Sequence, residues 1–242
     1  MSTVYLVRHG QAGTRDAYDS LSELGRQQSR LLGEHFVSQG VRFGSAYVGT
    51  LLRQQQTAAE VSRAFSDANV SFPAVNADPG FDEFDLGQIY REIAPQLCAE
   101  DPEFRREYEG MREQVRASEG AHAARIHRKW LPCDTKIVEA WIGGRYAYSG
   151  EKWDQFRGRV AACRLKIGDG RLRENILVFT SATPVAIWTG LSLEIFDERL
   201  LRLAGALNNT SYTILRLREA QLRLLTFNAV SHLAAPGLRT HR

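Results

Sequence analysis

Short runs of strand-forming residues alternate along this chain with longer amphipathic stretches, and this alternation restricts the possible folds more than any other feature. Residues 4–7 (VYLV) and 45–48 (SAYV) have the length and composition of strands. Each is followed by a stretch with apolar residues on one helical face, at about 22–38 and 53–65. This order predicts a three-layer α/β/α fold, in which a mostly parallel central sheet lies between two layers of helices.

The second half of the chain resumes this pattern after an interruption. The predicted elements there are a third central strand and its helix, then two closing strands, at residues 176–179, 184–196, 212–217 and 222–227. The interruption, about residues 88–150, is rich in charge and poor in strand formers. We expect it to form a helical cap inserted into a single domain over residues 1–235, which a loose tail at 236–242 follows.

The composition excludes several classes of protein. Of the 242 residues, 43% are hydrophobic and 24% are charged, which excludes a collagen-like or wholly disordered chain. Lysine and arginine number 31 against 28 acidic residues, so a strongly basic surface for nucleic acid is not expected. Residues 176–193 carry no formal charge, but their polar residues and proline favour a strand, a turn and a helix over a membrane span.

The cysteines and the first residues bear on the cellular compartment. Three cysteines stand far apart in the sequence and form no CxxC pair, so neither a disulfide framework nor a zinc site is expected. The apolar run at residues 4–7 is too short for the core of a signal peptide. The sequence therefore predicts a cytoplasmic protein that needs no metal and no cofactor.

The most specific feature is Arg8-His9-Gly10, directly after the first predicted strand, in the kind of loop where catalytic residues gather. A guanidinium is a forked donor that matches phosphate oxygens, an imidazole can attack phosphorus, and a glycine lets the backbone approach a ligand closely. The tripeptide therefore indicates phosphoryl transfer. It also fits a simpler interpretation, in which His9 only bonds the backbone at the edge of the sheet.

Further motifs follow this tripeptide in a fixed order along the chain. The set comprises a strand that ends in RHG, a helix start like LTxxGxxQA, a segment with a second arginine and a segment like LxExxxG, at residues 4–11, 21–28, 50–58 and 81–87. In this order they resemble the histidine phosphatase superfamily, also called the phosphoglycerate mutase-like family. The similarity continues at 208–211 and 224–228, and it departs at Gly49, where a serine is common.

The resemblance implies a role for each matching residue. Arg8 and Arg53 would hold the oxygens of the phosphoryl group that passes to His9. Glu83 would protonate the leaving oxygen and would then act as the base for the attacking water. Other carboxylates near Glu83 that could take this part are Asp78, Asp82 and Asp85.

The chain departs from the family in the turn after the third predicted strand. The family places a second histidine there, in an (S/T)HG turn, and Ala182 takes its position between Ser181 and Thr183. Loss of one such donor costs ~2.7 to 4 kcal/mol of transition-state stabilisation. Thr183 and Pro184 predict a helix cap and a first helical residue. Backbone amides near Ala182 and the hydroxyls of Ser181 or Thr183 can still contact phosphate, so binding is expected to survive better than turnover.

These features predict a phosphatase that hydrolyses a phosphomonoester or a phosphoprotein through phospho-His9, slowed by Ala182, with the cap selecting the substrate. The alternative is a pseudophosphatase that binds a phosphate ligand without turnover. A phosphoglycerate mutase fits less well, because a mutase must retain and return the phosphoryl group. The expected partners are a small phosphorylated substrate or a phosphoprotein, and neither nucleic acid nor a membrane.

The remaining histidines are expected outside the chemistry. His232 follows the last predicted strand and could approach the pocket, but an exposed position or a structural hydrogen bond is the favoured interpretation. The others are expected to face solvent: His35, His122, His127 and His241.

Overall fold

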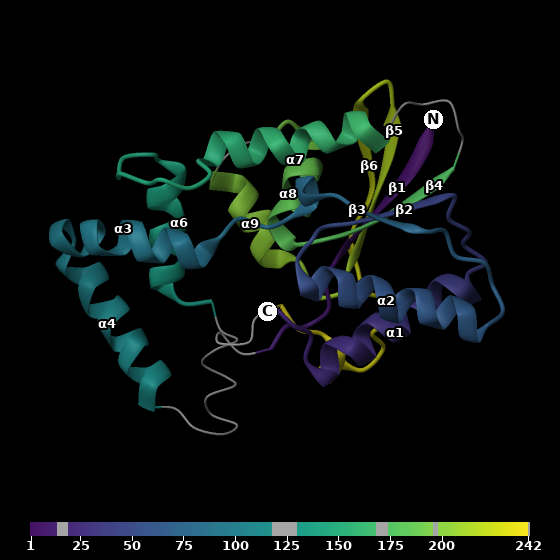
Figure 1. Cartoon of the computed structure of the whole chain (residues 1–242), viewed down its shortest axis with the longest axis horizontal. Coiled ribbons are helices and arrows are strands. Elements are labelled where there is room, and N and C mark those ends of the chain that lie inside the picture. The colour runs from purple at the N-terminus through teal and green to yellow at the C-terminus, as the bar shows by residue number, and fades with distance from the viewer. Residues whose placement is uncertain (14–18, 118–129, 168–173, 196–197, 242) are drawn as a thin grey trace. The chain divides into compact units, whose positions relative to one another are not determined.

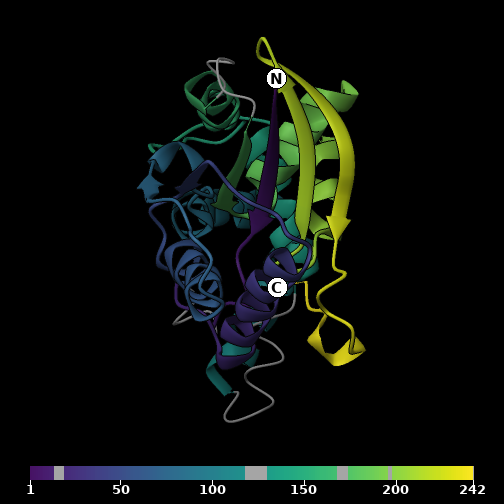
Figure 2. The ribbon, with the colours of Figure 1, turned by 90° about the vertical axis from the view of Figure 1, so that its right-hand side faces the viewer.

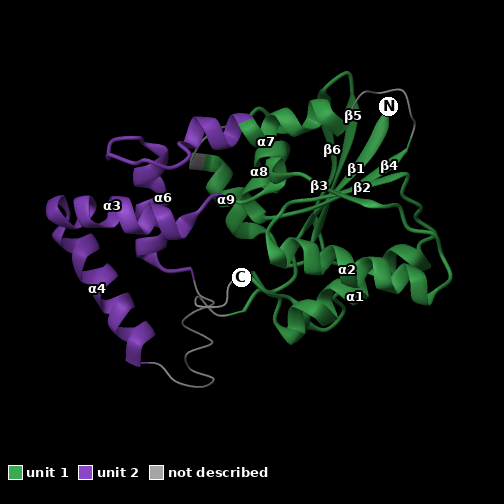
Figure 3. Ribbon diagram, in the orientation of Figure 1, with its two compact units in different colours: residues 1–13, 17–83, 159–242 green, residues 14–16, 84–158 purple. Residues whose placement is uncertain are grey.

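The structure of the chain is a computed structural model, and it describes residues 1–13, 19–117, 130–167, 174–195 and 198–241. It divides into two compact units (Figure 3). The first unit comprises residues 1–13, 17–83 and 159–242, and the second comprises 14–16 and 84–158. The predicted cap boundaries of 88 and 150 lie inside the second unit.

The first unit is built on one six-stranded sheet with the order β3-β2-β4-β1-β5-β6 (Figure 1). Its strands are β1 Ser2–Arg8, β2 Ser45–Val48, β3 Val75–Ala77, β4 Asn175–Thr180, β5 Tyr212–Arg218 and β6 Gln221–Ala229. The first four strands are parallel, and β5 and β6 run antiparallel side by side at one edge (Figure 2). The predicted mostly parallel sheet is confirmed.

The register brings the residues that follow β1, β2 and β4 to the same end of the sheet. The central strand β1 pairs with β4 so that Arg8 lies opposite Thr180, and β4 pairs with β2 so that Phe179 lies opposite Val48. The carboxyl ends of these three parallel strands therefore meet. Ligands of open α/β sheets bind at such ends.

Helices cover both faces of the sheet, as the alternation in the sequence predicts (Figure 1). On one face, α1 Glu23–Ser38 and α2 Leu52–Asp67 bury Phe36 and Phe65 against Phe179 of β4. On the other face lie α8 Ala182–Leu193 and α9 Glu198–Ala206, with Trp188 of α8 fully buried. Neighbouring residues of a strand point to opposite faces, so the fully buried run 176–179 serves both layers.

The second unit holds charged helices around a small aromatic core. Its helices are α3 Leu86–Glu100, α4 Pro102–Ala117, α6 Pro132–Ile142 and the first part of α7, which spans Trp153–Ile167. Trp141 lies 4.9 Å from Phe84 and 5.5 Å from Trp153, measured between ring centroids. Among the described residues, no helix is long and apolar enough to cross a bilayer.

The structure corrects the expected loose tail over its described residues. Residues Pro236–Leu238 form a short 3-10 helix, and the carbonyl oxygen of Thr240 accepts a hydrogen bond from the Asn209 amide at 2.7 Å. Hydrogen bonds to buried polar partners keep the tail in place. The tail has little apolar surface, so a hydrophobic pattern in the sequence does not reveal this order.

Candidate active site

His9 stands where the central strand β1 ends, and the backbone around it is fixed from both sides. Its N–H donates to the carbonyl oxygen of Thr180 at 2.9 Å, at the end of β4. Its own carbonyl oxygen accepts from the Thr210 amide at 3.3 Å and from Nδ2 of Asn209 at 3.2 Å. Only 2% of His9 is exposed. The backbone position from which the imidazole extends is therefore well defined.

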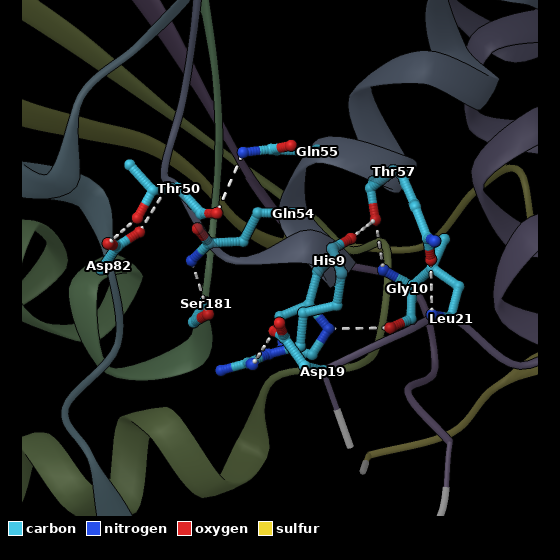
Figure 4. A network of polar contacts seen from close by, with 12 residues as sticks. His9, Gly10, Asp19, Leu21, Thr50, Gln54, Gln55, Thr57, Asp82 and Ser181 are labelled. Carbon is cyan, nitrogen blue, oxygen red and sulfur yellow. Dashed lines mark hydrogen bonds and ion pairs between the residues drawn. The ribbon is translucent and has the colours of Figure 1, made fainter. Parts of the chain in front are cut away.

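The contacts of the ring assign its tautomer (Figure 4). Nδ1 lies 2.8 Å from the Gly10 carbonyl oxygen, and Nε2 lies 3.2 Å from Nε of Arg53. A carbonyl can only accept and a guanidinium can only donate, so the proton sits on Nδ1 and the lone pair on Nε2. Burial, with the charges of Arg53 and Arg8, lowers the pKa of His9 well below its usual range. His9 is therefore neutral, with an unprotonated nitrogen at Nε2.

The packing of the loop against α1 requires a glycine at position 10. A Cβ at this position would lie 2.5 Å from the Gly25 carbonyl oxygen and 2.8 Å from Oγ of Ser29, both on α1. The Gly10 amide donates to Oγ1 of Thr57 at 3.0 Å. Only a residue without a side chain lets the loop pass so close to α1.

Arg53 reaches His9 from the first turn of α2. Arg53 is 7% exposed, so it is not an ordinary surface charge. Besides its contact with His9, its Nη1 lies 3.1 Å from the carboxylate of Asp19, a side chain that is 60% exposed. The same guanidinium thus contacts the His9 ring and the solvent-exposed carboxylate of Asp19.

The loop that delivers Arg53 explains the departure from serine at Gly49. A Cβ there would lie 1.9 Å from Oε1 of Gln54 and 2.5 Å from Oδ1 of Asp82. Asp82 in turn accepts hydrogen bonds from the amide and the hydroxyl of Thr50, just before α2 begins (Figure 4). These two polar side chains occupy the space that a serine side chain would need.

Arg8 is the other cation beside the ring. It is 5% exposed, its amide donates to the Ser211 carbonyl oxygen at 3.1 Å, and its Nη1 donates to the carbonyl oxygen of Leu207. Its charge helps to lower the pKa of His9. The structure thus brings Arg8, His9 and Arg53 together.

Glu83 contacts the beginning of α8. Its Oε2 accepts from the Thr183 amide at 3.0 Å, which places the carboxyl group at the positive end of the helix dipole. The amide of His9 bonds the carbonyl oxygen of Thr180, so only residues 181 and 182 separate the residue that holds His9 from Thr183, which holds Glu83.

The carboxylates named as alternatives to Glu83 have structural partners elsewhere. The carboxylate of Asp78 lies 2.7 Å from Nζ of Lys166 and also accepts a hydrogen bond from the Gly80 amide. Burial raises the pKa of Asp78, but these two contacts outweigh it, and the pKa is lowered. Asp82 accepts hydrogen bonds from the amide and the hydroxyl of Thr50. Asp85 accepts from the Gln88 amide and caps α3 in the second unit.

The beginning of α8 differs from the prediction. Ser181 is the N-cap and Ala182 the first helical residue, so Thr183 does not cap the helix and Pro184 lies third. Proline fits any position of a first turn, because the amides there have no partner inside the helix. Oγ of Ser181 accepts from Nε2 of Gln54 at 2.8 Å, and the Thr183 amide is bonded to Glu83. Ala182 is half-buried and offers no polar side-chain atom.

Sequence reasoning missed Gln54 and Thr57 of α2 and Asn209, which precedes β5, as residues that support the site. Each is fully buried. A buried amide or hydroxyl side chain needs partners, and here the partners are Ser181, the His9 carbonyl oxygen and the Gly10 amide. All three lie in segments that resemble the family, but nothing in those segments singles them out, because these residue types are common on surfaces.

The histidines outside the site divide into three groups. His232 is buried and its Nε2 lies 2.9 Å from Oγ1 of Thr210, which confirms the structural hydrogen bond. His35 is half-buried and bonds the Tyr212 hydroxyl at 3.2 Å, so its expected exposure is wrong. His241 is exposed. The last two, His122 and His127, lie outside the described residues.

No group of three or more His, Cys, Asp or Glu side chains within the described ranges is arranged to hold a metal ion.

Comparisons with known proteins show what the whole chain is similar to. The model of the histidine phosphatase superfamily (branch 1) matches residues 4–148 and 133–230. The mitochondrial serine/threonine-protein phosphatase Pgam5 of Caenorhabditis elegans is 20% identical over 152 residues, which cover 62% of this chain. The match spans only 52% of Pgam5, about half of its length.

Solved structures share the fold along nearly the whole chain. YhfR of Bacillus stearothermophilus has a TM-score of 0.63 and 18% identity, and covers 96% of this chain and 100% of its own. Phosphoglycerate mutase of Bacillus anthracis has a TM-score of 0.59 and 16% identity, over 96% and 95%. A mycobacterial glucosyl-3-phosphoglycerate phosphatase, solved with VO3, has a TM-score of 0.57 and 19% identity, over 95% and 100%.

Proposed function

Because the chain belongs to the histidine phosphatase superfamily, we propose that it hydrolyses a phosphate monoester, on a small molecule or on a protein, through a phosphohistidine formed at His9. The observation that carries this proposal is the contact of Arg53 Nε with His9 Nε2, at 3.2 Å. It keeps the lone pair on the nitrogen that would attack and places a cation beside that nitrogen. When a phosphoryl group arrives, the Nε–H of Arg53 can donate its hydrogen bond to an oxygen of that group instead of to His9.

In the first step, Nε2 of His9 attacks phosphorus, and the bond from phosphorus to the ester oxygen breaks. Arg8 and Arg53 hold the phosphoryl oxygens and offset their charge. Glu83, protonated in the substrate complex, gives its proton to the departing oxygen. The bond from Nδ1 to the Gly10 carbonyl oxygen stabilises the positive charge that the ring gains.

In the second step, water attacks the phosphohistidine. Glu83, now a carboxylate, takes a proton from the water while the bond from phosphorus to Nε2 breaks. Inorganic phosphate leaves, His9 returns to its neutral tautomer, and Glu83 is protonated again. The two steps together consume one water for each ester bond.

Ala182 makes this reaction slow. It occupies the position at which the family pattern has a second histidine and adds no donor to the phosphoryl group. One missing donor corresponds to a rate lower by a factor of about 100 to 1000. The same observation favours the second candidate, a pseudophosphatase that binds a phosphate ligand through Arg8 and Arg53 without turnover. A mutase fits least, because it must retain the phosphoryl group.

The test is phosphate release from an aryl phosphate by the wild-type protein and by His9→Ala. We expect slow release that His9→Ala abolishes and that His241→Ala, a change of the same kind at an exposed position, leaves intact. Equal release by wild type and His9→Ala would falsify the enzymatic proposal. Vanadate binding without release by the wild type would identify the pseudophosphatase.

A further inference from the structure

The C-terminal strap, residues 238–240, contacts the His9 loop through two buried amide side chains. Gln28 Oε1 accepts from the Gln11 amide at 2.9 Å, and Asn209 Nδ2 donates to the His9 carbonyl oxygen at 3.2 Å. Both amide side chains are fully buried, and both also contact Thr240. Gln28 is 212 positions from Thr240 in the sequence, so this connection exists only in the folded chain.

The backbone determines which way each amide faces. Gln28 Nε2 donates to the Leu238 carbonyl oxygen at 2.7 Å, and Asn209 Nδ2 donates to that of His9. Asn209 Oδ1 therefore faces the Thr240 hydroxyl and must accept from it, at 2.9 Å. The hydroxyl has one hydrogen to give and accepts from Gln28 Nε2, also at 2.9 Å. One hydroxyl thus joins both amides in a single orientation.

The two amides hold the two peptide units on either side of Gly10. Asn209 holds the carbonyl group of the unit between His9 and Gly10. Gln28 holds the N–H of the next unit, and the carbonyl group of that same unit accepts from Nδ1 of His9 at 2.8 Å. A peptide unit is planar, so the amide side chain that fixes its N–H also fixes the carbonyl that orients the ring.

We propose that the strap is a positioning device for His9, in which Thr240, acting through Gln28 and Asn209, holds the imidazole with its proton on Nδ1 and its lone pair on Nε2. The strap also forms a main-chain hydrogen bond with Asn209, whose amide donates to the Thr240 carbonyl oxygen at 2.7 Å. The value of this position for catalysis rests on the proposed function, but the ring can be observed without turnover.

The experiment compares Thr240→Val, which keeps the shape and removes the hydroxyl, with Thr240→Ser, which restores it. The ¹⁵N chemical shifts of the His9 ring report which nitrogen carries the proton. We expect Thr240→Val to mix the two tautomers and Thr240→Ser to keep the wild-type spectrum. With an aryl phosphate, kcat should fall about tenfold or more in the valine variant, with KM within about twofold. Thr189→Val is the matched control, since the Thr189 hydroxyl donates to a carbonyl oxygen within α8.

A second variant reaches the other arm of the strap. Gln28→Glu keeps an acceptor for the Gln11 amide and removes the donor to Leu238 and Thr240. It should reproduce the ring spectrum of Thr240→Val, and it serves in its place if the valine variant does not fold. An unchanged His9 spectrum in the folded variants, or a serine variant that behaves like valine, would overturn the strap.

The two proposals fail in different ways. An inactive wild type whose ring spectrum changes in Thr240→Val would retain the strap and reject the phosphatase. An active wild type whose kcat and ring spectrum are the same in Thr240→Val would retain the phosphatase and reject the strap.

Discussion

Each polar atom of His9, two in the backbone and two in the ring, has a hydrogen-bond partner. The backbone pair and Nδ1 meet main-chain groups of Thr180, Thr210 and Gly10, which the sheet and its loops hold in place. Nε2 meets the side chain of Arg53, which can change partners. At the scale of the residue, main-chain groups therefore bind every polar atom of His9 except Nε2, where the proposed reaction would occur.

Asp19 competes with an anion for Arg53. Its carboxylate lies 3.1 Å from Nη1, and 60% of its side chain is exposed. We expect Asp19→Asn to tighten vanadate binding by up to about fivefold, because an exposed ion pair contributes ~0.2 to 1 kcal/mol. Asp67→Asn, an exposed position with the same change of charge, is the control. Titration with vanadate measures both affinities, and equal shifts in the two variants would contradict a direct competition.

A donor restored at position 182 should raise turnover. If Ala182 faces the phosphoryl group, Ala182→His supplies the missing hydrogen bond and recovers part of a factor of about 100 to 1000 in kcat. Ala182→Met is the control for bulk without a donor. Steady-state kinetics with an aryl phosphate and vanadate titration provide the measurements. No change in either quantity would mean that residue 182 does not face the phosphate.

At the scale of the element, the beginnings of α2 and α8 show what a sequence pattern leaves open. Helix α2 has Leu51 at its N-cap, and the carboxylate that steadies the preceding loop belongs to Asp82, far along the chain. The Thr183-Pro184 pair predicts the start of α8 two residues too late, because proline is tolerated throughout a first turn. Partners from other segments decide these details, and no local pattern contains them.

Gly49→Ser should damage the β2–α2 loop even though serine is common at this position in the family. The new Cβ would lie 1.9 Å from Oε1 of Gln54, which must move away from Ser181. We expect a loss of ~1 to 3 kcal/mol in the free energy of unfolding, together with lower kcat. Gly110→Ser is the control, since a Cβ there meets nothing within 4 Å. Urea denaturation measures both, and equal stability of the two variants would refute the steric explanation.

At the scale of the whole molecule, most of the sheet was predictable, but its edge strand β3 and the ordered tail were not. Buried runs such as 176–179 and the amphipathic faces of α1 and α2 imply parallel strands between helices. The edge strand β3 escaped prediction because its three residues are all exposed. The ordering of the tail depends on polar side chains such as Gln28, whose partners lie more than 200 positions away. Apolar periodicity carries no information about such contacts.

The buried histidines should make the protein sensitive to acid. Burial, with a smaller effect of His35, lowers the pKa of His232 to about 3. Below the ordinary pKa of about 6.5, His232 binds a proton in the unfolded chain but stays neutral in the folded chain. The free energy of unfolding therefore falls as the pH drops from about 6.5 toward 3. Each such histidine contributes a slope of about 1.4 kcal/mol per pH unit.

His232→Gln should remove one such contribution. We expect the free energy of unfolding between pH 6.5 and 4 to fall less steeply than in the wild type, while His241→Gln, at an exposed position, keeps the wild-type slope. Urea denaturation across this pH range measures the slopes. Parallel curves for wild type and His232→Gln would show that His232 is protonated in the folded protein.

The resting contact between Arg53 and His9 has a consequence for what the protein can react with. A nitrogen whose lone pair is already covered is protected from neutral electrophiles, because these offer the guanidinium nothing in exchange. In the proposed reaction, an arriving anion would draw the guanidinium toward itself and uncover the nitrogen. Charge would then select the substrate before any feature of its shape.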